Sequence, residues 1–158
     1  MKIYIGETNI ILELIELEIL PEFFSLRAEF YTTQFITGSL SIPDYTIKVS
    51  KYVDTNHLTV HELSHEEITE ISNWKITPHL ISISERSVLW KIYKTGGIIL
   101  NGNPKMHKRI QVESIQAQGT DWIIDQLARA EIICSTQSMN LHKELKRIQS
   151  GIHNIKGR

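Results

Sequence analysis

The chain has 158 residues, of which 41% are apolar, and a net charge of −1, which suits a single domain spanning residues 1–158 with its own hydrophobic core. No apolar run reaches the roughly 20 residues that a membrane-spanning helix needs, and the opening segment is a poor secretory signal. The single cysteine, Cys134, excludes an internal disulfide and a zinc site built from several cysteines, so we expect a cytoplasmic protein without membrane contact, its thiol packed among apolar neighbours.

The first half of the chain alternates short strand-like runs with stretches of helical spacing. Apolar residues three or four positions apart indicate the helices, and apolar, β-branched or aromatic runs indicate the strands. In chain order we expect a strand at 2–5 ended by Gly6, a helix from a cap at Thr8 to about Leu17, a strand at 30–33, a helix from about Gln34, a second helical piece from Pro43 through Val49, and a strand at 58–61.

The second half continues the same alternation. We expect a helix opened by Ser64 with Glu67 at capping-box spacing, a helix at 85–94 capped by Ser84 and ended by Gly96-Gly97, an apolar strand at 98–100, a helix from Pro104, a short strand near Ile115, and C-terminal helices at about 120–130 and 135–148. Strands separated by helices predict an α/β domain, with a central parallel sheet and helices on both faces.

The segment His61-Glu62-Leu63-Ser64-His65 matches the H-E-x-x-H pattern of zinc metalloproteases, which requires both histidines on one continuous helix. Here His61 ends a predicted strand and Ser64 caps the helix behind it, so the two imidazoles would not stack one turn apart. The segment therefore predicts a strand end and a helix start instead of a zinc site. Four further histidines are expected to be solvated: His57, His107, His142 and His153.

Four segments resemble, in order, the motifs of the PIN-domain ribonucleases. The first three read IYIGETNIILEL, FYTTQFITGSL and LISISERSVLWKIYKTGGIILNGNPKMHKR. The tail GTDWIIDQLARAEIICSTQSMNLHKELKRI is similar to the paired C-terminal helices, at about 120–148, of a bacterial toxin-type subgroup. The resemblance covers nearly the whole chain and implies a three-layer α/β/α PIN-like fold.

This resemblance also implies a function. PIN-domain ribonucleases use three or four carboxylates to hold one or two Mg²⁺ or Mn²⁺ ions, which prefer oxygen ligands and activate a water against the phosphate of single-stranded RNA. The subgroup implies the toxin component of a toxin–antitoxin pair, with an antitoxin protein as partner and a homodimer as assembly.

The departures from the family pattern fall on the site. The first acid is Glu7 instead of Asp, and the third is Glu85, whereas the second and fourth positions are the neutral Ser39 and Asn103. The resemblance assigns metal binding to Glu7, Glu85 and Asn103, with Ser39 at the remaining catalytic position. The residues expected to support them are Asn9, Gln34 and Asn101.

Two of the four expected carboxylates are thus absent, and metal affinity falls as ligand charge is removed. We expect weak or absent metal binding and weakened or lost catalysis, which leaves a non-catalytic RNA- or protein-binding module as the alternative. The acids that could substitute are Asp44 and Asp54 in predicted loops, and Asp121 and Asp125 on a helix where surface pairing is the simpler role.

Charge is distributed unevenly along the chain. Residues 1–103 carry 8 Lys or Arg and 13 Asp or Glu, a net of −5, whereas residues 104–158 carry 9 and 5, a net of +4. Lys105, Lys108 and Arg109 follow Asn103 on a basic helix and would suit RNA phosphates, although a solvated basic face is an equally simple interpretation. Of the tryptophans, we expect Trp90 and Trp122 in the core and Trp74 partly exposed.

Overall fold

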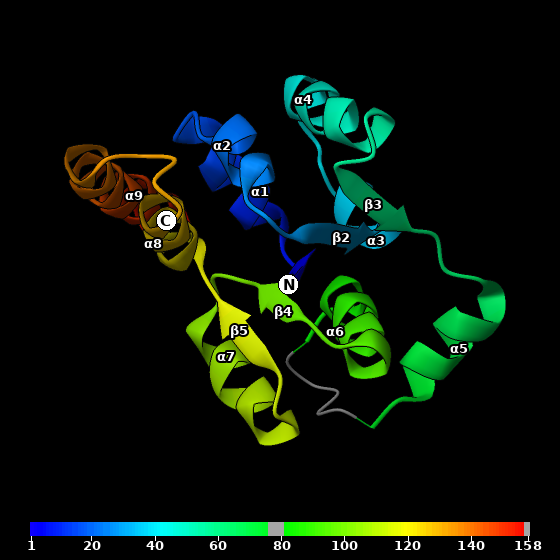
Figure 1. Ribbon diagram of the computed structural model, residues 1–158. Helices are drawn as coiled ribbons and strands as arrows, with labels where there is room; N and C mark the ends of the chain where they lie inside the picture. The colour runs from blue at the N-terminus through cyan, green and yellow to red at the C-terminus, as the bar shows by residue number, and fades with distance from the viewer. Residues whose placement is uncertain (76–80, 157–158) are drawn as a thin grey trace.

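A computed structural model, which describes residues 1–75 and 81–156, shows three α/β/α layers around a parallel sheet (Figure 1). The strands are β1 (Lys2–Ile5), β2 (Glu29–Thr33), β3 (Leu58–His61), β4 (Ile98–Leu100) and β5 (Gln116–Gln118). All four pairings are parallel, in the order β3-β2-β1-β4-β5. The predicted α/β class with a central parallel sheet is confirmed.

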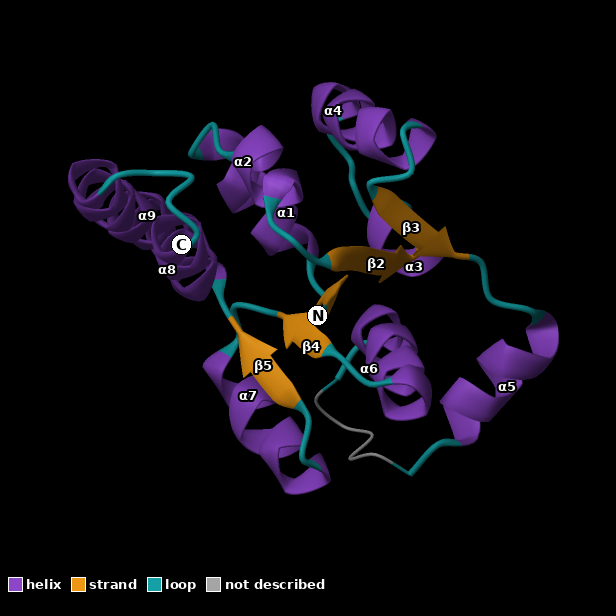
Figure 2. Cartoon of the chain, in the orientation of Figure 1, coloured by secondary structure: helices purple, strands orange, loops and turns teal. Residues whose placement is uncertain are grey.

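Helices cover both faces of this sheet (Figure 2). They are α1 (Thr8–Glu16), α2 (Leu20–Ser25), α3 (Gln34–Thr37), α4 (Pro43–Asp54), α5 (His65–Asn73), α6 (Ile83–Thr95), α7 (Pro104–Ile110), α8 (Thr120–Arg129) and α9 (Ser135–Lys156), with a 3₁₀ turn at Gln111–Glu113. In both views α1, α2, α4, α8 and α9 lie on one side of the sheet, and α6 and α7 lie on the other.

The centre of the core is the pair β1 and β4. Ile3, Ile5, Ile99 and Leu100 are fully buried, as expected for central parallel strands that are covered on both faces. Gly6 lies against the end of β4, and its N–H donates to the Leu100 carbonyl at 2.9 Å. The absence of a side chain at Gly6 allows this close approach. A Cβ at Gly6 would stand 2.5 Å from the Ile99 side chain. The residue after Gly6 is therefore held against the end of β4.

Several helix boundaries differ from those predicted. Glu7 occupies the cap position of α1, so Thr8 is the first helical residue and not the cap. Ser82, not Ser84, caps α6 and places Glu85 at its third position. Helix α2 was not predicted, because its six residues are too few to display a helical period. Helix α9 continues past residue 148 to Lys156.

Cys134 is exposed, which contradicts the expected packed thiol. Its backbone N–H donates to Gln137 Oε1 at 2.9 Å just before α9 begins. The preceding Ile133 is buried instead, because the chain turns toward solvent between the two residues. Within residues 1–75 and 81–156, no helix combines the length and the apolar character that crossing a membrane would require.

Candidate functional site

The order of the strands reverses between β1 and β4. The chain adds β2 and β3 on one side of β1 and then places β4 on the other. In open parallel sheets, ligands bind beyond the carboxyl ends of the strands at such a reversal. Glu7 follows β1 and residues 101–103 follow β4, so the first and third motif segments meet at this point.

Glu7 is hydrogen-bonded to the turn that follows β4. Its Oε2 accepts the N–H of Gly102 at 2.8 Å, and its Oε1 accepts a hydrogen bond from Asn9 Nδ2 at 3.0 Å. Asn9 therefore contacts the first predicted acid, as the resemblance implies. Both oxygens of this carboxylate are already bound to donors within the protein.

Glu85 reaches the same turn from the start of α6. Its Oε1 accepts a hydrogen bond from Asn101 Nδ2 at 3.2 Å. Its Oε2 accepts the N–H of Ser82 at 3.0 Å, and Ser82 Oγ accepts the Glu85 N–H at 3.1 Å, which completes a capping box. The structure therefore brings Glu7 and Glu85 onto the adjacent residues Gly102 and Asn101.

Asn101 is fully buried, and its polar groups are hydrogen-bonded. Its N–H donates to the Gln118 carbonyl at 2.9 Å, and its Oδ1 accepts the N–H of Asn103 at 2.8 Å. Its carbonyl accepts a hydrogen bond from His107 Nε2. His107 is thus half-buried and bonded to the turn, which corrects the expectation that it is solvated.

Asn103 serves as the cap of α7. Its Oδ1 accepts the N–H of Lys105 at 3.0 Å, so the oxygen that replaces the fourth acid already has a backbone donor. Behind this cap, Lys105 and Lys108 are exposed and Arg109 is half-buried. None of these three cations forms an ion pair with a described residue. The predicted phosphate-binding face therefore lies next to the turn.

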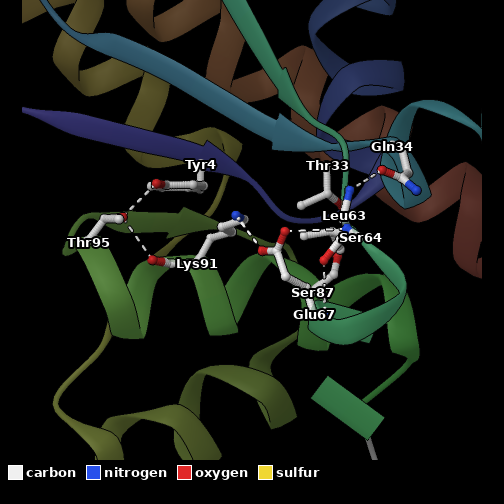
Figure 3. Close-up of polar contacts among 9 residues, drawn as sticks. All are labelled: Tyr4, Thr33, Gln34, Leu63, Ser64, Glu67, Ser87, Lys91 and Thr95. Atoms are coloured by element: carbon white, nitrogen blue, oxygen red, sulfur yellow. Dashed lines mark hydrogen bonds and ion pairs between the residues drawn. The ribbon is translucent and has the colours of Figure 1, made fainter. Parts of the chain in front are cut away.

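Two predicted site residues, Gln34 and Ser39, hydrogen-bond outside this cluster. Gln34 Oε1 accepts the N–H of Leu63 at 2.5 Å and so fastens α3 to the segment after β3 (Figure 3). Ser39 Oγ donates to the Phe35 carbonyl at 2.6 Å and is exposed. Within the described part of the chain, neither residue is hydrogen-bonded to Glu7 or Glu85, because both side chains satisfy nearby backbone groups instead.

The H-E-x-x-H segment has the predicted strand-to-helix form. His61 ends β3, and Ser64 and Glu67 form the capping box of α5. Glu67 also pairs with Lys91 of α6 at 2.9 Å (Figure 3). His61 stacks on Tyr31 with 5.3 Å between ring centroids, and burial, followed by the charge of Lys91, lowers the His61 pKa. The segment thus joins the sheet to α5, as a structural element.

The acids considered as substitute ligands have structural positions. Asp44 and Asp54 lie in the first and last turns of α4, not in the predicted loops, so both are at the surface of a helix. Asp125 pairs with His142 at 2.9 Å, which agrees with the expected surface role and shows that His142 has a partner. Trp90 is buried and Trp74 is half-buried, both as predicted. Trp122, which was expected in the core, is half-buried instead.

One buried carboxylate near the site was not predicted. Glu13 is only 6% exposed and accepts hydrogen bonds from the Thr120 hydroxyl and from Gln149 Nε2, the latter at 3.2 Å. Burial raises the pKa of Glu13, and the charges of Glu7 and Asp121 raise it further against these hydrogen bonds. The sequence did contain a signal for the burial of Glu13, namely its position on the apolar side of α1, one turn after Ile10.

A pocket of about 330 Å³ opens beside the same turn, between the starts of α7 and α8 and the face of α9. Its lining includes Gly102, His107, Thr120, His142, Lys146 and Gln149. The pocket therefore adjoins the residue that binds Glu7 and carries further basic groups.

A metal ion fits this arrangement poorly. Among the described residues, no group of three or more His, Cys, Asp or Glu side chains could hold one. The oxygens of Glu7 and Glu85, and Asn103 Oδ1, each accept an internal N–H. Each oxygen retains a second lone pair, but two carboxylates supply little charge for Mg²⁺ or Mn²⁺.

Models of known protein families give no match to this chain, and no curated protein matches it. A function for the chain is therefore inferred from the residues that meet where β1 and β4 end and from the motif resemblance.

Proposed function

We propose that this chain is a PIN-like domain of the metal-dependent ribonuclease class with weakened or lost catalysis. It would hold single-stranded RNA where β1 and β4 end, at Glu7, Glu85 and the turn at 101–103, which we call the β1–β4 crevice. The convergence of Glu7 and Glu85 on the Asn101–Gly102 turn carries this proposal. Two acids from separate motifs meet at the reversal of strand order, where a ligand is expected.

The charge at the site argues for weak catalysis. Ser39 and Asn103 are neutral, and Ser39 bonds to its own helix instead of the turn. Glu7 and Glu85 are the two carboxylates that would hold Mg²⁺ or Mn²⁺, and two carboxylates alone fit such an ion poorly. The chain's own residues orient the two acids: Asn9 and Gly102 fix Glu7, whereas Ser82 and Asn101 fix Glu85.

RNA binding is supported by the cations behind the turn. Lys105, Lys108 and Arg109 follow the cap of α7 directly and have no acidic partner in the described residues. Phosphates attract such side chains regardless of base sequence, and the affinity falls steeply with salt. We therefore propose that these three residues contact the RNA backbone.

The alternative is a non-catalytic module that binds RNA or a protein without metal. The internal hydrogen bonds of the acids favour it, because donors within the protein satisfy them. The resemblance further suggests an antitoxin-like protein partner and a homodimer. We also propose a cytoplasmic location, since a chain with a single cysteine needs no oxidising compartment to form an internal disulfide.

Cleavage and binding of single-stranded RNA should be measured separately. Cleavage is followed with Mg²⁺ or Mn²⁺ for the natural chain and for a restored variant carrying Glu7→Asp, Ser39→Glu, Glu85→Asp and Asn103→Asp. Because Glu85→Asp shortens a capping-box side chain, a second variant carries only Ser39→Glu and Asn103→Asp. We expect little cleavage by the natural chain and more by at least one restored variant. Equal and high activity in all three proteins would contradict an eroded site.

Binding is measured without metal by fluorescence anisotropy of labelled RNA. The triple variant Lys105→Ala, Lys108→Ala and Arg109→Ala should lose most of its affinity and have a shallower salt dependence. Its matched control replaces three exposed cations that do not line the pocket beside the turn: Lys48→Ala and Lys51→Ala on α4, and Arg129→Ala at the end of α8. Absence of RNA binding by the natural chain, or an equal loss in both triple variants, would overturn the proposal for the α7 face.

A further inference from the structure

A second pocket, of about 400 Å³, lies between α5 and α6. Its aromatic residues are Trp74 at the end of α5 and Trp90 and Tyr93 on α6, with Lys94 beside them. The polar residues Thr69, Glu70 and Asn73 complete its lining. None of these residues is among the predicted site residues of the β1–β4 crevice.

Aromatic surface is accessible in this pocket. The rings of Trp74 and Tyr93 have centroids 5.6 Å apart and planes inclined by 50°. Tyr93 is 61% exposed and Trp74 is half-buried, whereas Trp90 forms the closed side at 9% exposure. The exposed Tyr93 ring and the half-buried Trp74 ring can contact a flat ligand, and accessible aromatic rings stack bases regardless of sequence.

The cations beside the rings differ in their pairing. The Nζ atoms of Lys91 and Lys94 lie 5.3 and 5.4 Å from the Trp90 ring centroid. Lys91 also pairs with Glu67 at 2.9 Å, but Lys94 forms no ion pair with any described residue. Its charge is therefore available to an anionic group of a ligand that occupies the aromatic surface.

Arg86 connects this pocket to the crevice. It follows Glu85 directly, is buried, and donates to the carbonyls of Ile71, at 2.6 Å, and Trp74. The end of α5, and with it Trp74, is thereby fixed to the first turn of α6. Tyr93 lies eight residues after Glu85, about 12 Å along the helix at the usual rise of 1.5 Å per residue. A few nucleotides of extended single strand can span that separation.

We propose that this pocket is a second contact for single-stranded RNA, in which an unpaired base stacks on Trp74 and Tyr93 and Lys94 pairs with its phosphate. The proposal rests on the proposed function, because the same strand would also occupy the crevice. A proline-rich peptide is the other usual occupant of an aromatic-lined groove. The unpaired Lys94 favours the nucleotide, since prolines offer it no anionic group.

The first measurement compares dissociation constants for a ten-nucleotide single-stranded RNA of mixed sequence. Tyr93→Ala should weaken binding about tenfold, because one stacked base contributes about 1–3 kcal/mol. Tyr93→Phe keeps the ring and should bind as the natural chain does. Met139→Ala on α9 is the matched control, since Met139 is also 61% exposed. It should leave binding unchanged.

The second measurement follows tryptophan fluorescence and does not depend on a loss of affinity. Bound RNA should quench the tryptophan fluorescence of the natural chain, and Trp74→Phe should remove most of that quenching. Quenching that persists in Trp74→Phe, or equal affinity of Tyr93→Ala and the natural chain, would overturn the second contact. A response to a proline-rich peptide but not to RNA would also overturn it, in favour of peptide binding.

These results separate the two proposals. If Tyr93→Ala weakens binding but the triple variant of Lys105, Lys108 and Arg109 does not, the pocket proposal stands and the α7 face is wrong. If the triple variant weakens binding but Tyr93→Ala does not, the crevice proposal stands and the pocket proposal is wrong. If the natural chain binds no RNA, both proposals are overturned.

Discussion

Asn101 Nδ2 donates to Glu85 Oε1 at 3.2 Å, so a fully buried amide after β4 holds the acid in the first turn of α6. The same side chain accepts the N–H of Asn103 through Oδ1. One amide therefore links the third and fourth acid positions, Glu85 and Asn103, and helps to determine where both lie.

Asn101→Ala should lower the free energy of unfolding by about 2–3 kcal/mol, because the partly buried Asn103 N–H and the Glu85 carboxylate both lose a partner. Urea unfolding monitored by circular dichroism measures this change. Asn103→Ala, which removes only the cap of α7, should cost about 1 kcal/mol. An Asn101→Ala effect no larger than that of Asn103→Ala would show that the network contributes little.

Gly6→Ala should destabilise the protein by about 1–3 kcal/mol and displace Glu7. The new Cβ would stand 2.5 Å from Ile99 and 3.2 Å from the Leu100 carbonyl, so β1 and β4 would have to move apart. Gly151→Ala is the matched control, because nothing lies within 4 Å of its Cβ and alanine favours a helix. Thermal unfolding should show opposite shifts for the two variants, and a stabilising Gly6→Ala would contradict the close approach.

Ser82→Ala and Ser64→Ala each remove a capping box and should each cost about 1 kcal/mol. Only the first also frees Glu85, since the second capping box belongs to α5. We therefore expect Ser82→Ala, and not Ser64→Ala, to change RNA affinity or Mn²⁺ binding measured by calorimetry. Equal effects of the two variants on ligand binding would show that the capping box of α6 does not position Glu85 for the ligand.

Glu13 should make stability depend on pH. Burial raises its pKa above the ordinary value of 4.5, so the folded protein binds this proton more tightly than the unfolded chain. The stability that protonated Glu13 contributes is complete below pH 4.5 and declines as pH rises through the folded pKa. Glu13→Gln stays neutral and can still bond to Thr120 and Gln149, so its stability relative to the natural chain should increase over that range.

Urea unfolding of both proteins between pH 4 and pH 7 provides the measurement. The exposed Glu62 supplies the control, since Glu62→Gln should change stability by no more than about 0.5 kcal/mol at any pH. A constant difference between Glu13→Gln and the natural chain would mean that Glu13 does not titrate abnormally.

Prediction from the sequence succeeded for elements with a strong local signal. The apolar run at β4 and the Ser64–Glu67 capping box are determined by residues close together in the chain. Where two serines compete as the cap, the capping-box spacing decides. Ser82 and Ser84 both precede acidic or polar turns, but only Ser82 has Glu85 three residues later, and that capping box begins the helix.

For the site, the sequence by itself determined which residue types follow each strand, and the strand-then-helix pattern indicated that these positions meet at one edge of a sheet. Only the tertiary structure decided the partners. Asn101 is buried between β4 and α6, Gln34 satisfies a backbone N–H after β3, and Glu13 is enclosed by α8 and α9. Hydrogen bonds between segments 16 to 136 residues apart depend on how the helices pack, and no local pattern contains that information.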